Sequence, residues 1–417
     1  MTTDVTSDVI KRLGAHFEAR LPAALDLLRQ MVAINSFSAN PSGVDALGRL
    51  TAGAFEALGF APEFVPSANP DHGNHLVLCR TGRPGPMVGL ISHLDTVYPP
   101  EEEERNDFHW REEGDRIYGP GSCDIKGGTA MAHLVLGGLR AFWPGAFEQT
   151  NWIILLNAAE ERLAHDFGAL CRTRLPADAL AALVFEAGRR EGARFQMVTA
   201  RKGMITFQVR VEGRGAHAGS AHQEGANAVV QLARTIDRIA NLTDYGRDLT
   251  FNVGTITGGT VLNRVPHQAS AGGEARAFRP KVLSDGQEQL LALARAADVN
   301  NANGDYGCRV DVELCSRWEP WPPNTATERL LRLWQASGRQ LGFRVEAEQR
   351  GGLSDGNFVW DYVPTLDGLG PAGGNAHCSE RSPDGRKQPE FVQPSSFVPK
   401  ACLNVLSIAG LIGELSK

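Results

Sequence analysis

The 417-residue chain exceeds the size of an ordinary single core, and its 42% hydrophobic and 22% charged residues are typical of a folded protein with two or three domains. The net charge of −6, without a basic block, argues against nucleic acid as a partner. No apolar run is long enough to span a membrane, and the N-terminus lacks the regions of a secretory signal, so we expect a cytoplasmic protein without a membrane partner.

The first half of the chain predicts alternating helices and strands. Apolar residues recur at helical spacing over residues 8–32, where Pro22 allows a split into two helices, and a second helix is expected over 44–58. Four apolar runs have the length of strands, at 75–79, 87–91, 152–156 and 181–185. Helix-like segments separate several of them, which predicts a mostly parallel sheet covered on both faces. Ligands bind such sheets beyond the carboxyl ends of the strands.

The middle of the chain follows a different pattern. Its expected elements are, in order, an alternating strand at 205–211, a helix at 226–240, strands at 249–256 and 268–277, a helix at 286–299 and a strand at 309–314. This is the strand-helix-strand-strand-helix-strand order of a ferredoxin-like α+β sandwich. We therefore expect an inserted domain at 200–316, between two parts of a catalytic domain at 1–199 and 317–417.

Side chains that can bind metal follow three of the predicted strands. These side chains are His93 and Asp95 after the first strand, Glu160 and Glu161 after the second, and Glu186 after the third. Glycine-rich segments add Asp124 and His377. Adjacent carboxylates at the end of a buried strand repel each other unless one binds a metal and the other transfers a proton. A helix start favoured by its dipole is the structural alternative for such a pair.

Taken one at a time, these residues are more often structural than functional. The set is different, because one bridging carboxylate, plus one histidine and one carboxylate for each metal, makes a two-metal site of the kind that activates water. A phosphate-binding loop is the competing interpretation of the glycines at 119–128. The sequence there lacks the Gly-x-x-x-x-Gly-Lys-[Ser/Thr] pattern, which argues against nucleotide binding.

The ordered set resembles the M20 metallopeptidases and amidohydrolases, above all the glutamate carboxypeptidases, over nearly the whole chain. The resemblance implies an α/β, zinc-exopeptidase-like catalytic domain with a mostly parallel sheet, plus an inserted ferredoxin-like lid and dimerisation domain. It also implies two Zn²⁺ ions per subunit, bridged by Asp124, with His93 and Glu186 on one and Glu161 and His377 on the other. Glu160 would be the general base toward the metal-activated water, and Asp95 would orient His93.

The expected lid carries further residues that match the family. The segment 213–220 contains His217, to which the resemblance assigns stabilisation of the oxyanion across a dimer interface. Asn263 and Arg276 match positions that hold the terminal carboxylate of the substrate, although a surface salt bridge is the alternative for Arg276. The segment 162–166 and the charged loop 378–387 depart from the family pattern, and we expect both near the substrate entrance.

The resemblance implies hydrolysis of an amide bond next to a free carboxylate, by a carboxypeptidase or an N-acyl amino acid amidohydrolase. The substrate would be a small molecule or short peptide with a carboxylate, and the enzyme a homodimer formed through the lid. A deacetylase, dipeptidase or aminopeptidase on the same scaffold is the alternative within the enzymes. A non-catalytic binding protein that retains the fold is the alternative from another class.

Overall fold

The computed structural model describes residues 6–82, 84–162, 164–295 and 297–413, and it divides into two compact units. The first unit contains the described residues up to Thr199, together with Pro323–Gln349 and the chain from Ser354 onward. The second unit contains Ala200–Pro322 and Arg350–Leu353. Among the described residues, no helix has both the length and the hydropathy needed to cross a membrane.

A six-stranded sheet forms the centre of the first unit, in the order β1-β2-β6-β3-β7-β15. The strands are β1 (Ala61–Pro66), β2 (Asn74–Arg80), β3 (Met87–His93), β6 (Asn151–Asn157), β7 (Ala181–Val184) and β15 (Thr365–Leu366). The pairs β3–β6, β3–β7 and β7–β15 are parallel, whereas β1–β2 and β2–β6 are antiparallel. The parallel part brings the carboxyl ends of β3, β6 and β7 to one edge of the sheet.

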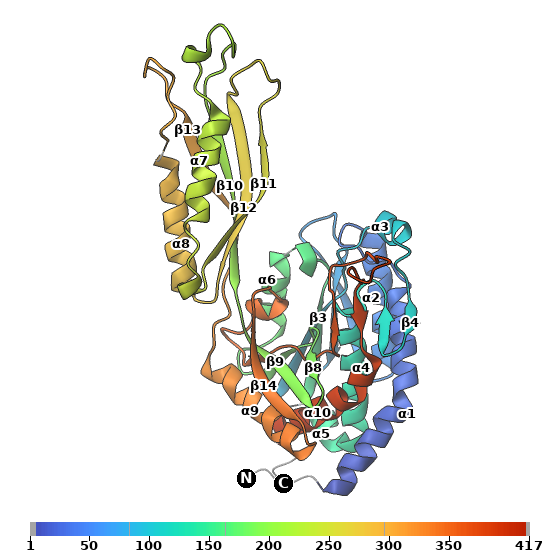
Figure 1. The fold of residues 1–417 in the computed structure, drawn as a ribbon. Helices are drawn as coiled ribbons and strands as arrows, with labels where there is room; N and C mark the ends of the chain where they lie inside the picture. The colour runs from blue at the N-terminus through green and yellow to red at the C-terminus, as the bar shows by residue number, and fades with distance from the viewer. Residues whose placement is uncertain (1–5, 83, 163, 296, 414–417) are drawn as a thin grey trace. The chain divides into compact units, whose positions relative to one another are not determined.

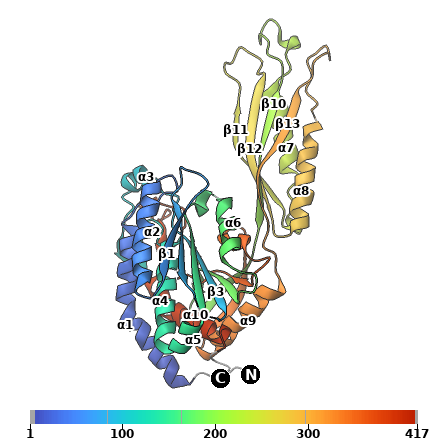
Figure 2. The same cartoon turned by 180° about the vertical axis from the view of Figure 1, so that it is seen from behind.

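Helices cover both faces of this sheet (Figure 1). The helices described in the first unit are α1 (Ser7–Val32), α2 (Pro41–Glu56), α3 (Pro100–Arg105), α4 (Lys126–Phe142), α5 (Pro144–Gln149), α6 (His165–Arg174), α9 (Thr325–Gln340) and α10 (Phe397–Leu411). Neighbouring strand residues point to opposite faces, so Leu90 packs in the core of α1, α4 and α10, while Ile91 packs with Phe167 of α6. The view from behind shows β1 at the edge of the sheet (Figure 2).

Two smaller sheets lie mostly in the first unit, in the orders β14-β9-β8 and β16-β17-β5-β4. The strands are β4 (Arg111–Glu113), β5 (Arg116–Tyr118), β8 (Arg189–Glu191), β9 (Arg194–Arg201), β14 (Arg344–Arg350), β16 (Gly373–Gly374) and β17 (Phe391–Val392). Short 3-10 helices occur at Glu160–Arg162, His222–Glu224, Tyr245–Arg247, Leu293–Arg295, Asp355–Phe358 and Pro394–Ser396. Pairing of β16 with β17 joins the two ends of the segment 375–390.

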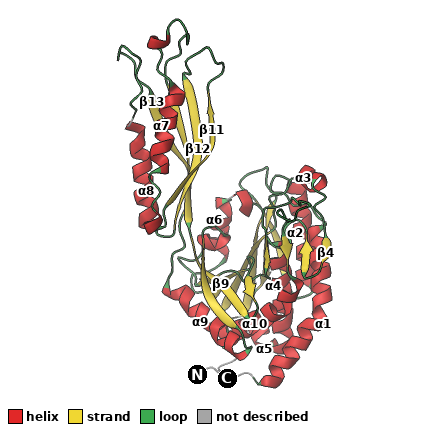
Figure 3. Cartoon of the chain, in the orientation of Figure 1, coloured by secondary structure: helices red, strands yellow, loops and turns green. Residues whose placement is uncertain are grey.

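The second unit is an α+β sandwich of two helices on a four-stranded antiparallel sheet, in the order β11-β12-β10-β13 (Figure 3). Its elements are β10 (Gly203–Glu212), α7 (Ala228–Ala240), β11 (Thr250–Gly258), β12 (Gln268–Ala277), α8 (Pro280–Ala292) and β13 (Arg309–Trp318). Ile205, Leu232 and Leu290 belong to the core between helices and sheet. The order of elements is the ferredoxin-like one that the sequence predicted.

Helices α1 and α8 differ from the sequence-based expectation, and proline is involved in both. The structure shows α1 as one helix with Pro22 inside it, because buried residues on both sides of the proline, such as Phe17 and Leu28, pack into one core. Helix α8 begins at Pro280, before the expected start at residue 286. Proline suits the first position of a helix, where its missing N–H group costs no hydrogen bond.

Candidate metal centre

Five predicted ligands meet at the carboxyl edge of the central sheet. His93 is the last residue of β3, Glu161 lies in the 3-10 helix that follows β6, and Glu186 follows β7 closely. Asp124 lies in the glycine-rich loop before α4, and His377 follows β16. The structure therefore brings together predicted ligands from five separate segments.

Asp124 lies between the two histidines. Its Oδ1 atom is 3.1 Å from Nε2 of His93, and its Oδ2 atom is 3.3 Å from Nε2 of His377. On the first side, Oε1 of Glu186 lies 3.9 Å from Nε2 of His93. On the second side, Oε2 of Glu161 lies 3.2 Å from Nε2 of His377. Within each trio the possible ligand atoms lie within 4.8 Å of one another, close enough to share one cation.

The charges of this centre fit bound cations. Burial raises the pKa of Glu160, and the charges of Glu161 and Glu186 raise it further. Burial also raises the pKa of Asp124, but hydrogen bonds to His377 and His93 outweigh burial and hold this pKa below its usual value. Four carboxylates around two imidazoles leave an excess of negative charge, which two divalent cations would compensate. Imidazole and carboxylate are also the donors that zinc accepts.

Asp95 has two structural roles at the centre. Its carboxylate accepts hydrogen bonds from the backbone N–H groups of Glu160 and Glu161, at 2.9 and 3.2 Å, and from the hydroxyl of Ser38 at 2.6 Å. Its backbone oxygen lies 3.0 Å from Nδ1 of His93, which assigns the proton to Nδ1 in the neutral ring. The Nε2 lone pair then points to the cation position, as a metal ligand requires.

Glu390 is a buried residue of the site to which the sequence analysis assigned no role. Its Oε1 atom accepts hydrogen bonds from the backbone N–H groups of Cys123 and Asp124, at 2.7 and 2.9 Å. Its Oε2 atom accepts one from the hydroxyl of Tyr98 at 2.7 Å. Burial raises the pKa of Glu390 to about 7. Glu390 thus holds the turn that presents Asp124, and its partners lie too far away in sequence for a local pattern to reveal it.

The charged loop that departs from the family pattern begins directly after His377. His377 and Asn375 have left-handed backbone angles, with φ of 65° and 60°, a conformation that non-glycine residues rarely adopt outside turns and functional sites. Arg381 of this loop forms hydrogen bonds with both carboxylate oxygens of Glu113, and its guanidinium lies 4.8 Å from the ring centre of Tyr118. In the other departing segment, residue 163 lies outside the described residues.

His217 and Asn263 lie in neighbouring loops of the second unit, and their surroundings are described within that unit. The N–H groups of Gly219 and Ser220 both donate to Nδ1 of His217, each at 3.1 Å. The proton of the neutral ring therefore lies on Nε2, which makes this atom of an exposed residue a hydrogen-bond donor. The N–H group of Ala218 donates to the backbone oxygen of Asn263 at 2.9 Å, and this bond links the two loops.

Arg276 lies on β12 of the second unit and forms the salt bridge that the sequence analysis considered as its alternative role. Its Nε and Nη2 atoms donate to the two carboxylate oxygens of Glu274, at 2.8 and 2.9 Å, and Nη1 donates to the backbone oxygen of Gly351 at 3.2 Å. One N–H group on each terminal nitrogen remains outside these three hydrogen bonds.

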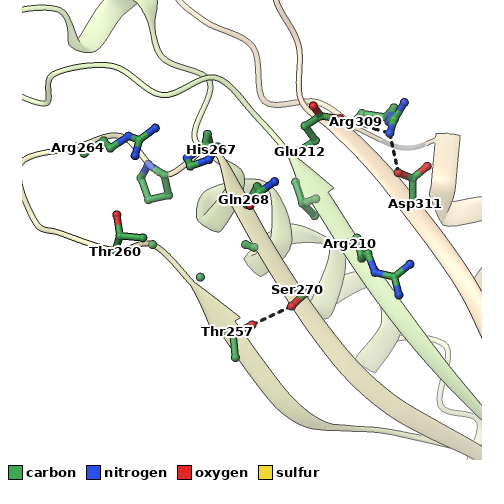
Figure 4. Close-up of a pocket in the computed structure, with 15 residues that line it drawn as sticks. Arg210, Glu212, Thr257, Thr260, Arg264, His267, Gln268, Ser270, Arg309 and Asp311 are labelled. Atoms are coloured by element: carbon green, nitrogen blue, oxygen red, sulfur yellow. Dashed lines mark hydrogen bonds and ion pairs between the residues drawn. The ribbon is translucent and has the colours of Figure 1, made fainter.

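A polar cavity of about 580 Å³ lies on the open face of the sheet in the second unit (Figure 4). Arg309 at its edge pairs with Glu212 and Asp311, at 3.3 and 3.2 Å. Arg264 also lines the cavity, and its backbone forms a β-bridge with that of His217. The cavity therefore adjoins the loop of the residue predicted to stabilise the oxyanion.

Similarity to known proteins decides the family. A family model for the peptidase dimerisation domain matches residues 199–302. Carboxypeptidase G2 of Pseudomonas sp. (strain RS-16) is 31% identical over 368 residues, which cover 86% of this chain and 84% of the relative. The chain belongs to the M20 peptidase family. It is therefore a metallopeptidase or amidohydrolase, and the non-catalytic alternative is set aside.

A further curated relative has a different activity, and a solved structure shows the fold. Acetylornithine deacetylase of Klebsiella pneumoniae (strain 342) is 28% identical over 392 residues, which cover 90% of this chain and 95% of the relative. The crystal structure of a tripeptidase from Staphylococcus aureus subsp. aureus Mu50 matches with a TM-score of 0.74 and 21% identity, over 94% of this chain and 98% of that one. The M20 fold, with mixed α/β sheets and a dimerisation domain, is thereby confirmed.

Proposed function

We propose that this M20 enzyme hydrolyses an amide bond next to a free carboxylate, with two zinc ions held by His93, Asp124, Glu161, Glu186 and His377. The observation that carries the proposal is the division of the two Asp124 oxygens between His93 and His377. A further glutamate lies beside each histidine, so each cation would have one imidazole and one carboxylate besides the shared one. When bound, the two ions lower the pKa of a water molecule and polarise the amide carbonyl.

Glu160 is the proposed general base. Its pKa is raised by burial and by neighbouring carboxylates, so it holds a proton more strongly than an exposed glutamate does, as a proton acceptor requires. It would take the proton of the attacking water and deliver it to the leaving nitrogen. Asp95 holds the backbone of Glu160 and Glu161, which keeps the base and the ligand in fixed relation. His217, through its Nε2–H group, would stabilise the oxyanion, by the resemblance from the partner subunit.

Asn263 and Arg276 are the proposed contacts of the substrate carboxylate. Glu274 occupies one side of the Arg276 guanidinium, so a carboxylate would use the two terminal N–H groups that remain. The likeness to carboxypeptidase G2 supports a substrate with a free carboxylate. The likeness to acetylornithine deacetylase supports an acetylated amino acid as the second candidate substrate.

The enzyme is proposed to form a homodimer through the second unit. Strand β11 lies at one edge of the sheet, contains no charged residue and is largely exposed. Ile256 on this strand and Leu262 beyond it are exposed, at 61% and 103%. The opposite edge strand, β13, carries charged residues, as edge strands that avoid pairing do. An uncharged edge strand can pair with a second copy of itself.

The experiment that tests the proposal uses matched substrates with the zinc-loaded protein. A panel of N-acyl amino acids and dipeptides is compared with the same compounds carrying a C-terminal amide. We expect hydrolysis of the free carboxylates and about 100-fold slower hydrolysis of the amides, since a charged contact is lost. Equal rates for both series would favour an aminopeptidase and contradict the carboxylate requirement.

A variant at the base completes this experiment. Glu160→Gln keeps the size of the side chain but cannot accept the proton, so the rate should fall by about 10²–10⁴-fold while the zinc content stays the same. Retained activity in this variant would exclude Glu160 as the base. An acetyl series within the panel separates a deacetylase from an enzyme that prefers larger acyl groups.

A further inference from the structure

The side chain of His75 links strand β2 to the residues after β6, just beyond the point where the backbone pairing of the two strands ends. The register between β2 and β6 ends at the pair Leu76 and Leu156, one residue after His75 and two residues before Ala158. Nδ1 of His75 accepts a hydrogen bond from the backbone N–H group of Ala158 at 3.1 Å. The residue is 1% exposed and its ring lies 5.3 Å from the ring of Phe167, so this contact is made inside the protein.

Asp166 fixes the tautomer that this contact needs. The lone pair of Nδ1 is committed to Ala158, so the proton of the ring lies on Nε2, 3.1 Å from Oδ2 of Asp166. The same oxygen accepts hydrogen bonds from the N–H group of Ala68 at 2.6 Å and the hydroxyl of Ser67 at 2.9 Å. Burial raises the pKa of Asp166, but these hydrogen bonds outweigh burial and hold this pKa below its usual value.

Ala158 begins the turn that carries the proposed base. Four consecutive backbone N–H groups, from residue 158 to residue 161, each donate to a side chain. The acceptors are His75 for Ala158, Asn157 for Ala159, and Asp95 for both Glu160 and Glu161. The turn is therefore held by acceptors from three strands or strand ends, and His75 is the acceptor at its beginning.

We propose that His75 and Asp166 are positioning residues for the turn of Glu160 and Glu161. The proposal rests on the proposed function, in which Glu160 is the base and Glu161 a zinc ligand. Asp166 belongs to the segment 162–166, in which the chain departs from its family's pattern. One residue of this unusual segment therefore holds His75, and His75 holds the turn. Displacement of a catalytic group by about 1 Å can lower a rate by about 100-fold.

The first test compares two substitutions at His75. His75→Leu removes the acceptor, and we expect kcat to fall by about 10–100-fold with KM unchanged, because the base is misplaced while the substrate contacts are intact. In His75→Asn, the side-chain oxygen stands the same number of bonds from Cβ as Nδ1 and can accept from Ala158. Most of the lost kcat should therefore return in His75→Asn. Equal losses in both variants, or no loss in His75→Leu, would overturn the proposal.

Two control variants separate positioning from simple loss of stability. Val363 belongs to the same buried apolar cluster as Phe167, which packs against His75. Val363→Ala removes methyl groups from this cluster without touching the turn, so it should lower the melting temperature and leave kcat unchanged. Asp166→Ala keeps the acceptor for Ala158 but frees the tautomer, so kcat should fall by a smaller factor, about threefold to tenfold. If Val363→Ala loses as much kcat as His75→Leu for the same loss of melting temperature, the effect is structural and the proposal is wrong.

A readout that does not depend on hydrolysis is the affinity for zinc. Because Glu161 lies in the turn, His75→Leu should weaken one of the two zinc sites by about tenfold in a competition with a chelator, and His75→Asn should restore it. This result would support positioning even if the wild-type protein hydrolysed no amide of the panel, an outcome that would sink the proposed function alone. Unchanged zinc affinity together with unchanged kcat in His75→Leu would refute the positioning role.

Discussion

At the scale of single residues, each histidine of the candidate metal centre contacts carboxylates through its Nε2 atom, the same nitrogen that would bind a cation. Hydrogen bonds to Asp124 and Glu161 raise the pKa of His377 to about 11. Burial lowers the pKa of His93, but hydrogen bonds to Asp124 and Asp95 outweigh burial and raise it well above the usual value. Each raised pKa favours the protonated ring when no cation is bound, and a cation must displace such a proton to bind the same nitrogen.

This displacement predicts a pH dependence of metal binding. Each raised pKa means that the proton is held below that pKa and released above it, so the apparent affinity for zinc should rise with pH, by up to tenfold per pH unit for each proton displaced. Calorimetry at pH 7 in two buffers of different ionisation enthalpy should detect protons released on zinc binding. An affinity that does not change between pH 6 and pH 8, with no protons released, would contradict the assignment of these ligands.

Residue type and position at strand ends predicted that His93, Glu161 and Glu186 lie at one edge of the sheet, and the structure brings them together there with Asp124 and His377. A histidine or carboxylate that directly follows an apolar strand is visible in the sequence, and parallel strands bring such residues together. Glu390 and His75 were not predicted as site residues, because each acts on backbone N–H groups that are distant in sequence. Whether Arg276 pairs with Glu274 was open for another reason. The two residues lie on one face of β12, where Glu274 and the carboxylate of a ligand would compete for the same guanidinium.

At the scale of elements, two successive glycines of α4 show how differently neighbouring positions can pack. A Cβ atom at Gly137 would meet no heavy atom within 4 Å, whereas one at Gly138 would lie 2.4 Å from the ring of Phe17. Alanine restricts the unfolded chain more than glycine does. Gly137→Ala should therefore stabilise the protein by about 0.5–1 kcal/mol, and Gly138→Ala should destabilise it by about 1–3 kcal/mol through overpacking.

Urea unfolding of the two alanine variants measures these free energies against the same wild type. The comparison is internally controlled, because the variants differ only in the face of α4 that receives the methyl group. The same sign of change in both variants would contradict the packing described for α4. This helix begins two residues after Asp124, so its packing also anchors the loop that presents the proposed bridging ligand.

Periodicity predicted the existence and type of the main elements better than their ends. The strands of the central sheet follow apolar runs that are continuous because both faces are buried. The ends of helices depended on prolines, and Pro280 starts α8 earlier than its apolar spacing indicated. Short strands such as β16 and β17 have two residues each and carry no periodic signal, so their pairing around the segment 375–390 appears only in the structure.

At the scale of the whole molecule, the edge strand β11 leads to a prediction about assembly. Ile256→Lys places a charge on the uncharged edge that is proposed to pair with a second copy, so the variant should be a monomer in solution. Cys315→Lys is the matched control, because Cys315 is exposed on β13 at the opposite edge of the same sheet. Light scattering after size exclusion measures both masses. A dimeric Ile256→Lys variant, or a monomeric Cys315→Lys variant, would contradict the assigned interface.

The fold class could be predicted from the sequence because two different periodicities occur in separate stretches of the chain. Apolar strands alternating with helices indicated the α/β sheet, and the alternating strand at 205–211 began the ferredoxin-like pattern. Substrate choice could not be predicted. The segments 162–166 and 378–387, which we expect near the substrate entrance, have no counterpart of similar composition in the family pattern. Side chains of the second segment make contacts between residues far apart in sequence, such as that of Arg381 with Glu113, and no periodic pattern predicts such contacts.

We propose that metal held at the sheet edge makes this protein an amide hydrolase. The most direct test is the hydrolysis rate of the best N-acyl amino acid of the panel, measured with zinc bound, after complete chelation, and after zinc is returned. We predict that activity disappears on chelation, returns with zinc, and reaches its maximum at two ions per chain. Full activity in protein shown to be free of metal would contradict the account.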